Sequence, residues 1–289
     1  MAHNHDHGTK NLGLAFFLNL TFTIVEIIGG LFTNSVAILS DALHDLGDSL
    51  SLGISWYLGK KSGKAANHKF TFGYQRLSLL GALINSIVLI VGSVFVVIEA
   101  IKRLAEPQMP DAQGMLYFAI AGVAINGFAA YKVSSGKSLN EKVISWHLLE
   151  DVLGWAAVLV VSIILMFWDV PWLDPALSIA ITIFILYNVV KRLRETLFVF
   201  LQGKPEGVDL DEIEKKILAT PHVASMHHTH LWSLDGEHHV FTTHLKLKNI
   251  SQLKDIKQLK LDIKEMLKSE YDFSHYTIET ELEDEDCNM

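Results

Sequence analysis

The sequence predicts a polytopic α-helical membrane protein with a separate α+β domain at its C-terminus. Half of the 289 residues are hydrophobic, only 19% are charged, and the mean hydropathy is +0.29. This balance is typical of a membrane protein. Residues 1–203 are neutral overall, whereas residues 204–289 hold ten lysines and eighteen acidic residues, which give the whole net charge of −8. The division predicts a membrane part and a soluble part, and the acidity of the soluble part argues against a nucleic acid partner.

Six apolar segments have about the 17–25 residues that a transmembrane helix needs, or come close to it. They are Leu12–Phe32, Val36–Gly59, Leu77–Ile101, Met115–Tyr131, Val143–Phe167 and Trp172–Val190. We therefore expect a six-helix transmembrane domain over residues 12–202, preceded by a histidine-containing cytosolic tail at 1–11.

The charges of the connecting segments predict the orientation. Basic residues gather between segments 2 and 3, between segments 4 and 5, and after segment 6, whereas the opposite side has only Lys102 and Arg103. Because loops rich in Lys and Arg stay on the cytoplasmic side, both termini are expected in the cytoplasm. No eukaryote-style targeting segment is visible, which favours the plasma (inner) membrane of a prokaryote.

The region from residue 203 to 284 has the pattern of a small cytosolic domain. "DLDEIEKKILAT" predicts an amphipathic helix with acidic residues in its first turn. "VASMHHTHLWSL" and "EHHVFTTHLKLK" predict two strands of a hairpin, "LKDIKQLKLDIKEMLKSEY" a second helix, and "HYTIETELE" a last strand. The order αββαβ predicts a ferredoxin-like or metallochaperone-like sandwich, with helices on one face of a sheet. Residues 285–289 are a charged terminal tail.

Four ionisable residues interrupt the second apolar segment in "SDALHDLGDSL". They are Asp41, His44, Asp45 and Asp48, and their i, i+3, i+4, i+7 spacing places them on one stripe of a helix. A carboxylate at the centre of a bilayer costs about 2.5–3.5 kcal/mol on insertion scales. These side chains are therefore expected to have partners.

The fifth segment supplies a matching set in "SWHLLEDVLGW". His147 and Asp151 are again four residues apart, with Glu150 beside them. Two helices of one bundle would then each present an H-x-x-x-D pair. On the second helix, geometry alone does not choose between His44/Asp48 and Asp41/Asp45 as the pair that faces the fifth.

Two imidazole nitrogens and two carboxylate oxygens are a suitable donor set for a tetrahedral divalent cation. The carboxylates also neutralise the double charge of the ion, which matters in a low dielectric. Imidazole disfavours Mg²⁺ and Ca²⁺, and the single cysteine, Cys287, allows no thiolate cluster. Zn²⁺ is the first expectation, with Co²⁺, Cd²⁺, Fe²⁺ or Mn²⁺ behind it. The alternative is that each His–Asp pair is a hydrogen-bonded lock between helices.

The chain resembles the cation diffusion facilitators over nearly its whole length. The resemblance is carried by "NSVAILSDALHDLGD", "FGYQRLSLLGALIN", "SWHLLEDVLGW", "WLDPALSIAI" and "VASMHHTHLWSL". It implies a homodimeric Zn²⁺/H⁺ antiporter that exports metal from the cytoplasm and is not an enzyme. Carried over residue by residue, the implied transport site is His44, Asp48, His147 and Asp151. Asp41, Asp45 and Glu150 are left either as neighbours that support this site or as polar residues of helix contacts.

A second metal site is implied in the cytosolic domain, where many family members bind a regulatory ion. On the matching positions its ligands are His227, His244, Glu279 and Glu281. Simple strand alternation predicts that His228 and His230 share one face of the sheet while His227 lies on the other. The alternative is that these are surface or packing residues of a small sheet.

Two other classes of protein compete with a transporter. A membrane-embedded zinc hydrolase would need an open metal position and a general base, typically in H-E-x-x-H, and the sequence has no such string. A membrane metal sensor or structural metal-binding protein, without transport, is the remaining alternative.

Overall fold

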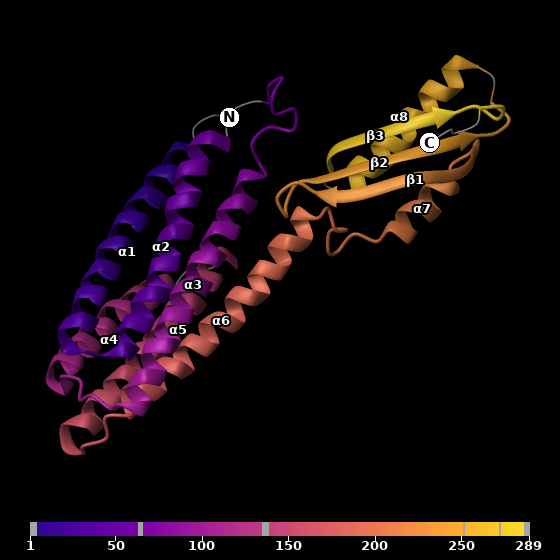
Figure 1. Cartoon of the computed structure of the whole chain (residues 1–289). Helices are drawn as coiled ribbons and strands as arrows, with labels where there is room; N and C mark the ends of the chain where they lie inside the picture. Colours follow the sequence, from indigo (N-terminus) through magenta and orange to yellow (C-terminus); the bar gives the residue numbers. More distant parts are fainter. Residues whose placement is uncertain (1–4, 63–65, 135–138, 251, 272, 286–289) are drawn as a thin grey trace. The chain divides into compact units, whose positions relative to one another are not determined.

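Six long helices form the first part of the chain in the computed structural model (Figure 1), which describes residues 5–62, 66–134, 139–250, 252–271 and 273–285. They are α1 (His5–Thr33), α2 (Val36–Ser62), α3 (Leu77–Ala105), α4 (Ala112–Ser134), α5 (Leu139–Phe167) and α6 (Leu173–Phe200). Among the described residues, five of these helices are long and apolar enough to cross a membrane, and α2, with its three aspartates, is not one of them. The predicted polytopic helical fold is confirmed, and α1 begins at His5, before the predicted start at Leu12.

A close approach of α4 and α5 fixes the part of α5 that follows Asp151. Trp155 is 1% exposed, and its ring occupies the place where a Cβ on Gly122 would stand. A residue without a side chain is therefore needed on α4, as is common where membrane helices pack closely. Phe22 of α1 meets the same ring edge-on, at 6.4 Å between centroids. Three helices thus hold Trp155, one turn from Asp151.

The start of α2 is held by a carboxylate from α6. Asp174, 1% exposed, accepts hydrogen bonds from Ser35 Oγ at 2.5 Å, Val36 N at 2.8 Å and Ala37 N at 3.3 Å. The first N–H groups of a helix have no partner inside the helix, and a carboxylate also suits the positive end of the helix dipole. Asp174 therefore caps a helix to which it does not belong.

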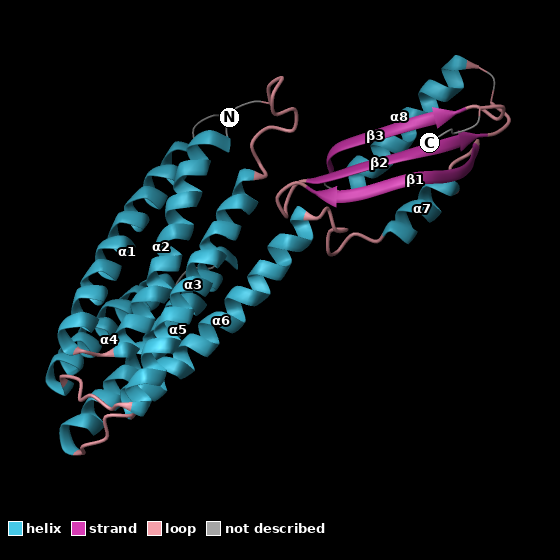
Figure 2. Ribbon diagram, viewed as in Figure 1, coloured by secondary structure: helices cyan, strands magenta, loops and turns pink. Residues whose placement is uncertain are grey.

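The C-terminal part of the chain is a three-stranded sheet with two helices. In chain order it contains α7 (Leu210–Leu218), β1 (Val223–Ser233), β2 (His239–Leu247), α8 (Leu253–Glu270) and β3 (Phe273–Glu281). The strand order is β1-β2-β3, with β1 antiparallel to β2 and β3 parallel to β2 (Figure 2). The predicted αββαβ order is confirmed.

The hydrophobic core of this domain lies between the sheet and its helices. Ile213 and Ile217 of α7 and Ile263 and Leu267 of α8 pack in one cluster with Phe241 and other residues of β2. Side chains alternate along a strand, so buried Phe241, Thr243 and Leu245 point to the helices. His244 therefore points to the opposite face.

The chain divides into two compact units. One contains residues 1–64 and 81–193, and the other contains residues 65–80 and 194–289. Within the second unit, the segment between α2 and α3 touches β3, where the rings of Phe72 and His275 meet edge-on at 5.2 Å.

Candidate metal centre

The helices α2 and α5 bring three of the four predicted transport ligands together. His44 Nε2 lies 3.7 Å from Asp48 Oδ2 on its own helix and 3.7 Å from Asp151 Oδ1 on α5. The side chains are 25%, 23% and 10% exposed in the order His44, Asp48, Asp151. An imidazole nitrogen thus lies between two carboxylates from two helices, which is a suitable start for a divalent cation site of nitrogen and oxygen donors.

The fourth predicted ligand, His147, belongs to α5, but its side chain lies outside the described residues. On an α-helix it is one turn before Asp151, so its Cα is on the same side of α5 as that carboxylate. Glu150, for which a supporting role and a helix contact were both left open, is exposed on α5.

The two other aspartates of α2 lie near different neighbouring helices. Asp41, 5% exposed, contacts α5 at Gly154, where a Cβ would stand 3.3 Å from Asp41 Oδ1. Asp45, 7% exposed, lies towards α1, and its backbone carbonyl accepts a hydrogen bond from Asn19 Nδ2 at 3.1 Å. Both are buried in the bundle. The measured approach of α2 to Asp151 is that of His44, at 3.7 Å.

A polar stripe on α1 was not predicted from the sequence. Asn19, Thr23 and Glu26 follow an i, i+4, i+7 spacing, and the first two contact Ser49 of α2 at 3.0 and 3.3 Å. Glu26 is 1% exposed. The signal was present as the spacing of three polar residues within an apolar segment.

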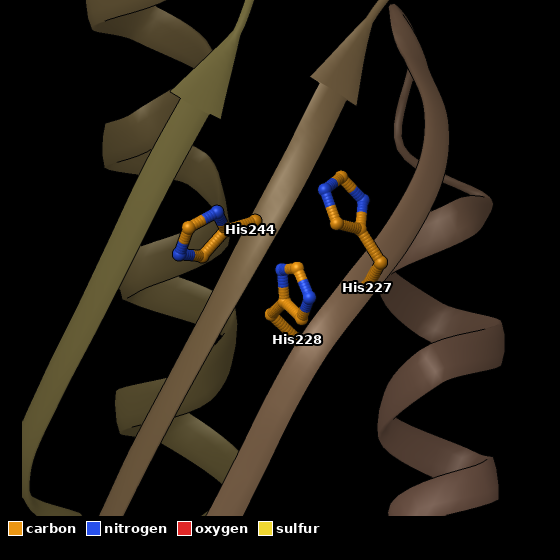
Figure 3. Close-up of side chains that lie close together, drawn as sticks. All are labelled: His227, His228 and His244. Carbon is orange, nitrogen blue, oxygen red and sulfur yellow. The ribbon is translucent and has the colours of Figure 1, made fainter. Parts of the chain in front are cut away.

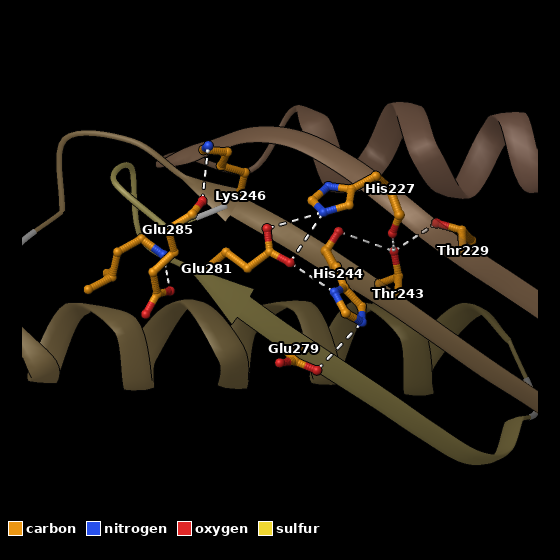
Figure 4. A network of polar contacts seen from close by, with 9 residues as sticks. His227, Thr229, Thr243, His244, Lys246, Glu279, Glu281 and Glu285 are labelled. Atoms are coloured by element: carbon orange, nitrogen blue, oxygen red, sulfur yellow. Dashed lines mark hydrogen bonds and ion pairs between the residues drawn. The ribbon is translucent and has the colours of Figure 1, made fainter. Parts of the chain in front are cut away.

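In the cytosolic domain, the three strands bring all four predicted ligands side by side. His227 is paired with His244 across β1 and β2, and His244 with Glu279 across β2 and β3. Glu281 connects the two imidazoles, since its Oε1 lies 2.8 Å from His244 Nδ1 and 3.2 Å from His227 Nε2. The Glu279 carboxylate lies 3.5 Å from His244 Nε2 (Figure 4).

The structure adds His228 to this cluster and corrects the strand pattern. The ring nitrogens of His227, His228 and His244 lie within 4.8 Å of one another (Figure 3). The prediction that His227 and His228 lie on opposite faces was wrong, because the β1–β2 register shifts between His227 and His230 and His228 has a φ of +47°. A β-bulge of this kind redirects a side chain to the face of its neighbour.

The donors of this second cluster fit a transition metal of the zinc type. Three imidazoles whose ring nitrogens lie within 4.8 Å of one another, with the Glu281 carboxylate beside His227 and His244, match the nitrogen and oxygen donors that bind Zn²⁺ tetrahedrally. The hydrogen bonds that Glu281 accepts from His227 and His244 would also orient the rings, as carboxylates around metal-binding histidines do. The cluster can therefore hold an ion with little rearrangement of the strands.

Two family models match the two parts of the chain. The cation efflux transmembrane domain matches residues 12–201, and the cation efflux protein cytoplasmic domain matches residues 205–283. Together they cover almost the whole sequence. This chain belongs to the cation diffusion facilitator family.

Relatives of this facilitator span nearly the same length. The metal cation efflux system protein CzcD of Cupriavidus metallidurans is 35% identical over 97% of this chain and 90% of its own. The zinc transporter ZitB of Pectobacterium atrosepticum is 33% identical over 100% and 92%. A cadmium, cobalt and zinc/H(+)-K(+) antiporter of Bacillus subtilis is 32% identical over 98% and 93%.

A solved structure also matches the cytosolic part of this facilitator. It is the metal-bound C-terminal domain of the CzcD transporter from Cupriavidus metallidurans, 37% identical, covering 26% of this chain and all of that one, with a TM-score of 0.24.

Membership of the family confirms the predicted class. This facilitator is a multi-pass membrane protein of cation efflux, and since its relatives are named as efflux and transport proteins, the expectation that it is not an enzyme is confirmed.

Proposed function

We propose that this protein exports Zn²⁺ from the cytoplasm in exchange for protons, by alternating access at a site made of His44, Asp48, His147 and Asp151. The observation that carries the proposal is the position of the His44 imidazole between Asp48 of α2 and Asp151 of α5. Donors from two helices can be brought together or drawn apart when the helices move, which binding and release require.

The donor set supports zinc as the main substrate. Two imidazoles and two carboxylates provide four ligands and two negative charges, so a divalent cation would be bound without excess charge. The relatives' names point the same way, since they include a zinc transporter and an antiporter of cadmium, cobalt and zinc. Cd²⁺ and Co²⁺ accept the same donors and are proposed as further substrates.

Competition between metal and protons at one site would couple the two fluxes. A metal ion needs neutral imidazole and ionised carboxylate, so its binding releases protons and proton binding displaces it. A site that faces each side of the membrane in turn would then carry metal one way and protons the other.

The charges of the loops predict the orientation of the protein in the membrane. We propose that the protein lies in a bacterial plasma membrane with both termini in the cytoplasm, because the basic loops share one side. Export is then movement away from the side of the cytosolic domain. A homodimer is proposed because the cytoplasmic family model is that of a dimerising domain.

For the cytosolic cluster we propose regulatory metal binding rather than transport. His227, His228, His244 and Glu281 would hold one ion, with Glu279 at the edge of the site. The donors lie on strands of one sheet, so they cannot separate as readily as donors on two helices. A bound ion would therefore signal the concentration of metal in the cytoplasm and would not itself be transported.

Transport in liposomes tests the proposal. Purified full-length protein should take up Zn²⁺ when a pH gradient is imposed, whereas His147→Ala and Asp151→Ala should lose nearly all of this uptake. Asp169→Asn, at an exposed position after α5, is the matched control and should transport like the parent.

Two results would contradict it. If both site variants transport like the parent, the site is misplaced. If the parent binds zinc but moves none under any gradient, the protein is a membrane metal sensor or structural metal-binding protein instead.

A further inference from the structure

A buried hydrogen bond joins α2 to α6 one turn before His44. Ser40 Oγ of α2 lies 2.8 Å from Thr182 Oγ1 of α6, and both residues are 0% exposed. Thr182 Oγ1 donates to the Ser178 carbonyl at 2.8 Å, which is 3.5 Å from Ser40 Oγ. Because that bond uses the single proton of the threonine hydroxyl, Ser40 is the donor to Thr182.

Helix α6 also holds α2 at a second point. The Asp174 carboxylate accepts hydrogen bonds from the first N–H groups of α2, and Thr182 follows Asp174 by eight residues on α6. At 1.5 Å per residue, these two contacts lie about 12 Å apart along α6. A helix held only at its first turn can still rotate about its own axis, whereas a second contact through a side chain prevents that rotation.

The rotation of α2 decides where its proposed metal ligands stand. His44 follows Ser40 by four residues, which is about one turn along the helix and about 40° around it. Side-chain atoms lie about 5–6 Å from a helix axis, so a rotation of about 10° moves them by about 1 Å. Metal–ligand distances tolerate only about 0.2 Å. A contact that fixes this rotation therefore fixes the position of His44 relative to Asp151 of α5.

The attachment uses one of two buried hydroxyls of α6. Ser178 lies one turn before Thr182 and is also 0% exposed, but its Oγ has no hydrogen-bond partner among the described residues. Two hydroxyls in nearly the same surroundings thus differ in a single respect, which is that the one of Thr182 binds α2. This pair separates the effect of the hydrogen bond from the effect of a polar group inside the bundle.

We propose that Thr182 is a positioning residue of zinc transport, which acts through Ser40 to fix the rotation of α2 and hold His44 and Asp48 towards Asp151. The proposal rests on the transport site proposed above. Helix α6 supplies none of the four proposed ligands, and it thereby sets their geometry. Since metals that share donors are distinguished by site geometry, the same bond favours Zn²⁺ over the larger Cd²⁺.

The test compares variants of the two α6 hydroxyls in full-length protein. Thr182→Val removes the hydroxyl with little change of shape, Thr182→Ser keeps it, and Ser178→Ala is the matched control. Zinc affinity is titrated in detergent, with His227 and His244 replaced by alanine so that the membrane site alone is measured. Uptake of Zn²⁺ and of Cd²⁺ into liposomes over a series of concentrations gives the KM and the maximal rate. The midpoint of thermal unfolding is recorded for each variant.

We expect Thr182→Val to lower zinc affinity and raise the KM for zinc about fivefold or more, because a buried hydrogen bond is lost and Ser40 is left without its acceptor. The maximal rate should stay within about twofold of the parent, and Cd²⁺ uptake should fall less than Zn²⁺ uptake. Thr182→Ser and Ser178→Ala should match the parent. A role in stability alone would lower the unfolding midpoint and leave both the KM and the ratio of the two metals unchanged.

A double variant tests whether the two residues act through one bond. Ser40→Ala combined with Thr182→Val removes both partners, so no buried hydroxyl of this pair is left unpaired. If the two residues act through one hydrogen bond, the rise in KM of the double variant should not exceed that of Thr182→Val. Rises that multiply would show that the two side chains act independently, which contradicts the proposal.

Other results would also overturn the inference. One is a zinc affinity and a KM of Thr182→Val within about twofold of the parent. Another is an equal change in Ser178→Ala, which would show that any substitution between α2 and α6 disturbs the site. If Thr182→Val does not fold, Ser40→Ala decides, and an unchanged KM contradicts the proposal.

Failure of the proposed function gives a different result. A parent that binds zinc but moves none refutes transport, and the zinc affinities in detergent then still decide whether Thr182 positions the ligands. If Asp151→Ala binds zinc like the parent, the membrane site itself is misplaced and this inference is refuted with it.

Discussion

The two clusters of this protein use the same side chains, imidazole and carboxylate, on different kinds of scaffold. In the membrane bundle, His44 stands 3.7 Å from both Asp48 and Asp151, and the donors come from two helices. In the cytosolic sheet, His244 Nδ1 stands 2.8 Å from Glu281 Oε1, and the donors come from hydrogen-bonded strands.

The difference between them is one of preorganisation. In the sheet, carboxylates already orient the rings, which favours tight and lasting metal binding. In the bundle, the donors come from two separate helices, with His44 Nε2 3.7 Å from Asp48 and from Asp151, so movement of the helices can draw them together around a cation and apart again. We therefore expect the scaffold, rather than the residue types, to separate a regulatory site from a transport site.

The largest effect should follow removal of a membrane ligand. Asp48→Asn replaces a charged oxygen donor with a neutral amide, and zinc affinity at the membrane site should fall more than about 100-fold, because loss of an outer-shell partner alone costs 10–100-fold. Zinc titration of full-length protein in detergent, in a His227→Ala and His244→Ala background, measures this site alone.

The control is Asp169→Asn, which removes an exposed carboxylate outside the helices. An unchanged zinc affinity in Asp48→Asn would show that α2 contributes a different pair of metal ligands. The proposed membrane site could then no longer be compared with the cytosolic cluster.

The next effect should be at the sheet. Glu281→Gln replaces the carboxylate donor of the cytosolic cluster with a neutral amide and weakens the contacts that orient His227 and His244, so the zinc affinity of this cluster should fall about 10–100-fold. The membrane site should keep its affinity. Titration of the full-length protein should therefore show one weakened and one unchanged class of site.

Glu283→Gln is the matched control, because Glu283 is exposed just beyond β3. If Glu281→Gln binds like the parent, the imidazoles alone hold the ion and preorganisation by the carboxylate is not what distinguishes this site.

A smaller effect should come from the remote cap of α2. Asp174→Ala removes three hydrogen bonds at the start of the helix that carries His44 and Asp48, and we expect about 2 kcal/mol less stability, as for the stronger N-caps. The midpoint of thermal unfolding in detergent should fall, with Asp169→Ala as the exposed control. Loss of zinc affinity only at the membrane site would support the view that the two metal sites depend on separate scaffolds. Loss of zinc affinity at both sites would contradict that view.

The smallest effect should come from the β1–β2 hairpin, whose register places His227 opposite His244. Partial burial acts to raise the pKa of Asp235, but hydrogen bonds from the N–H groups of His238 and Glu237 and from the His238 ring outweigh it and lower that pKa. A lowered folded pKa gives stability that is present above the unfolded value, about pH 4, and is lost as the pH falls through the folded value.

Asp235→Asn should therefore destabilise the hairpin by about 1 kcal/mol near pH 7, and the difference from the parent should shrink as the pH falls below about 4. Hydrogen exchange of β1 and β2 in the full-length protein, compared at each pH with Glu237→Gln as control, measures this. A difference from the parent that does not change with pH would disprove the role of the carboxylate charge.

Much of this architecture could be predicted from the sequence because it depends on local period and composition. Apolar length predicts the helices, and a spacing of four predicts that His44 and Asp48 share a face. The choice of that pair over Asp41 and Asp45 needed the family resemblance, since residues on one stripe are equivalent until a neighbouring helix is placed.

The rest depends on contacts that no local pattern contains. The addition of His228 depends on a bulge with a positive φ at a residue other than glycine. In the sequence, Glu26 is one acidic residue in an apolar segment, and only the packing of the helices buries it. In the sequence, Asp174 is an acidic residue at the start of the last apolar segment, whereas the groups it binds lie 137 to 139 positions earlier in the chain.

That last distance has a consequence for how the protein is made. During synthesis, α2 leaves the ribosome long before α6, so its first N–H groups must be satisfied by water or lipid head groups until Asp174 arrives. The helix that carries half of the proposed transport site is therefore completed only when the last membrane helix is inserted. In a chain interrupted before residue 174, the first N–H groups of α2 would lack the Asp174 carboxylate. The metal ligands on α2 would not yet be held in their final position.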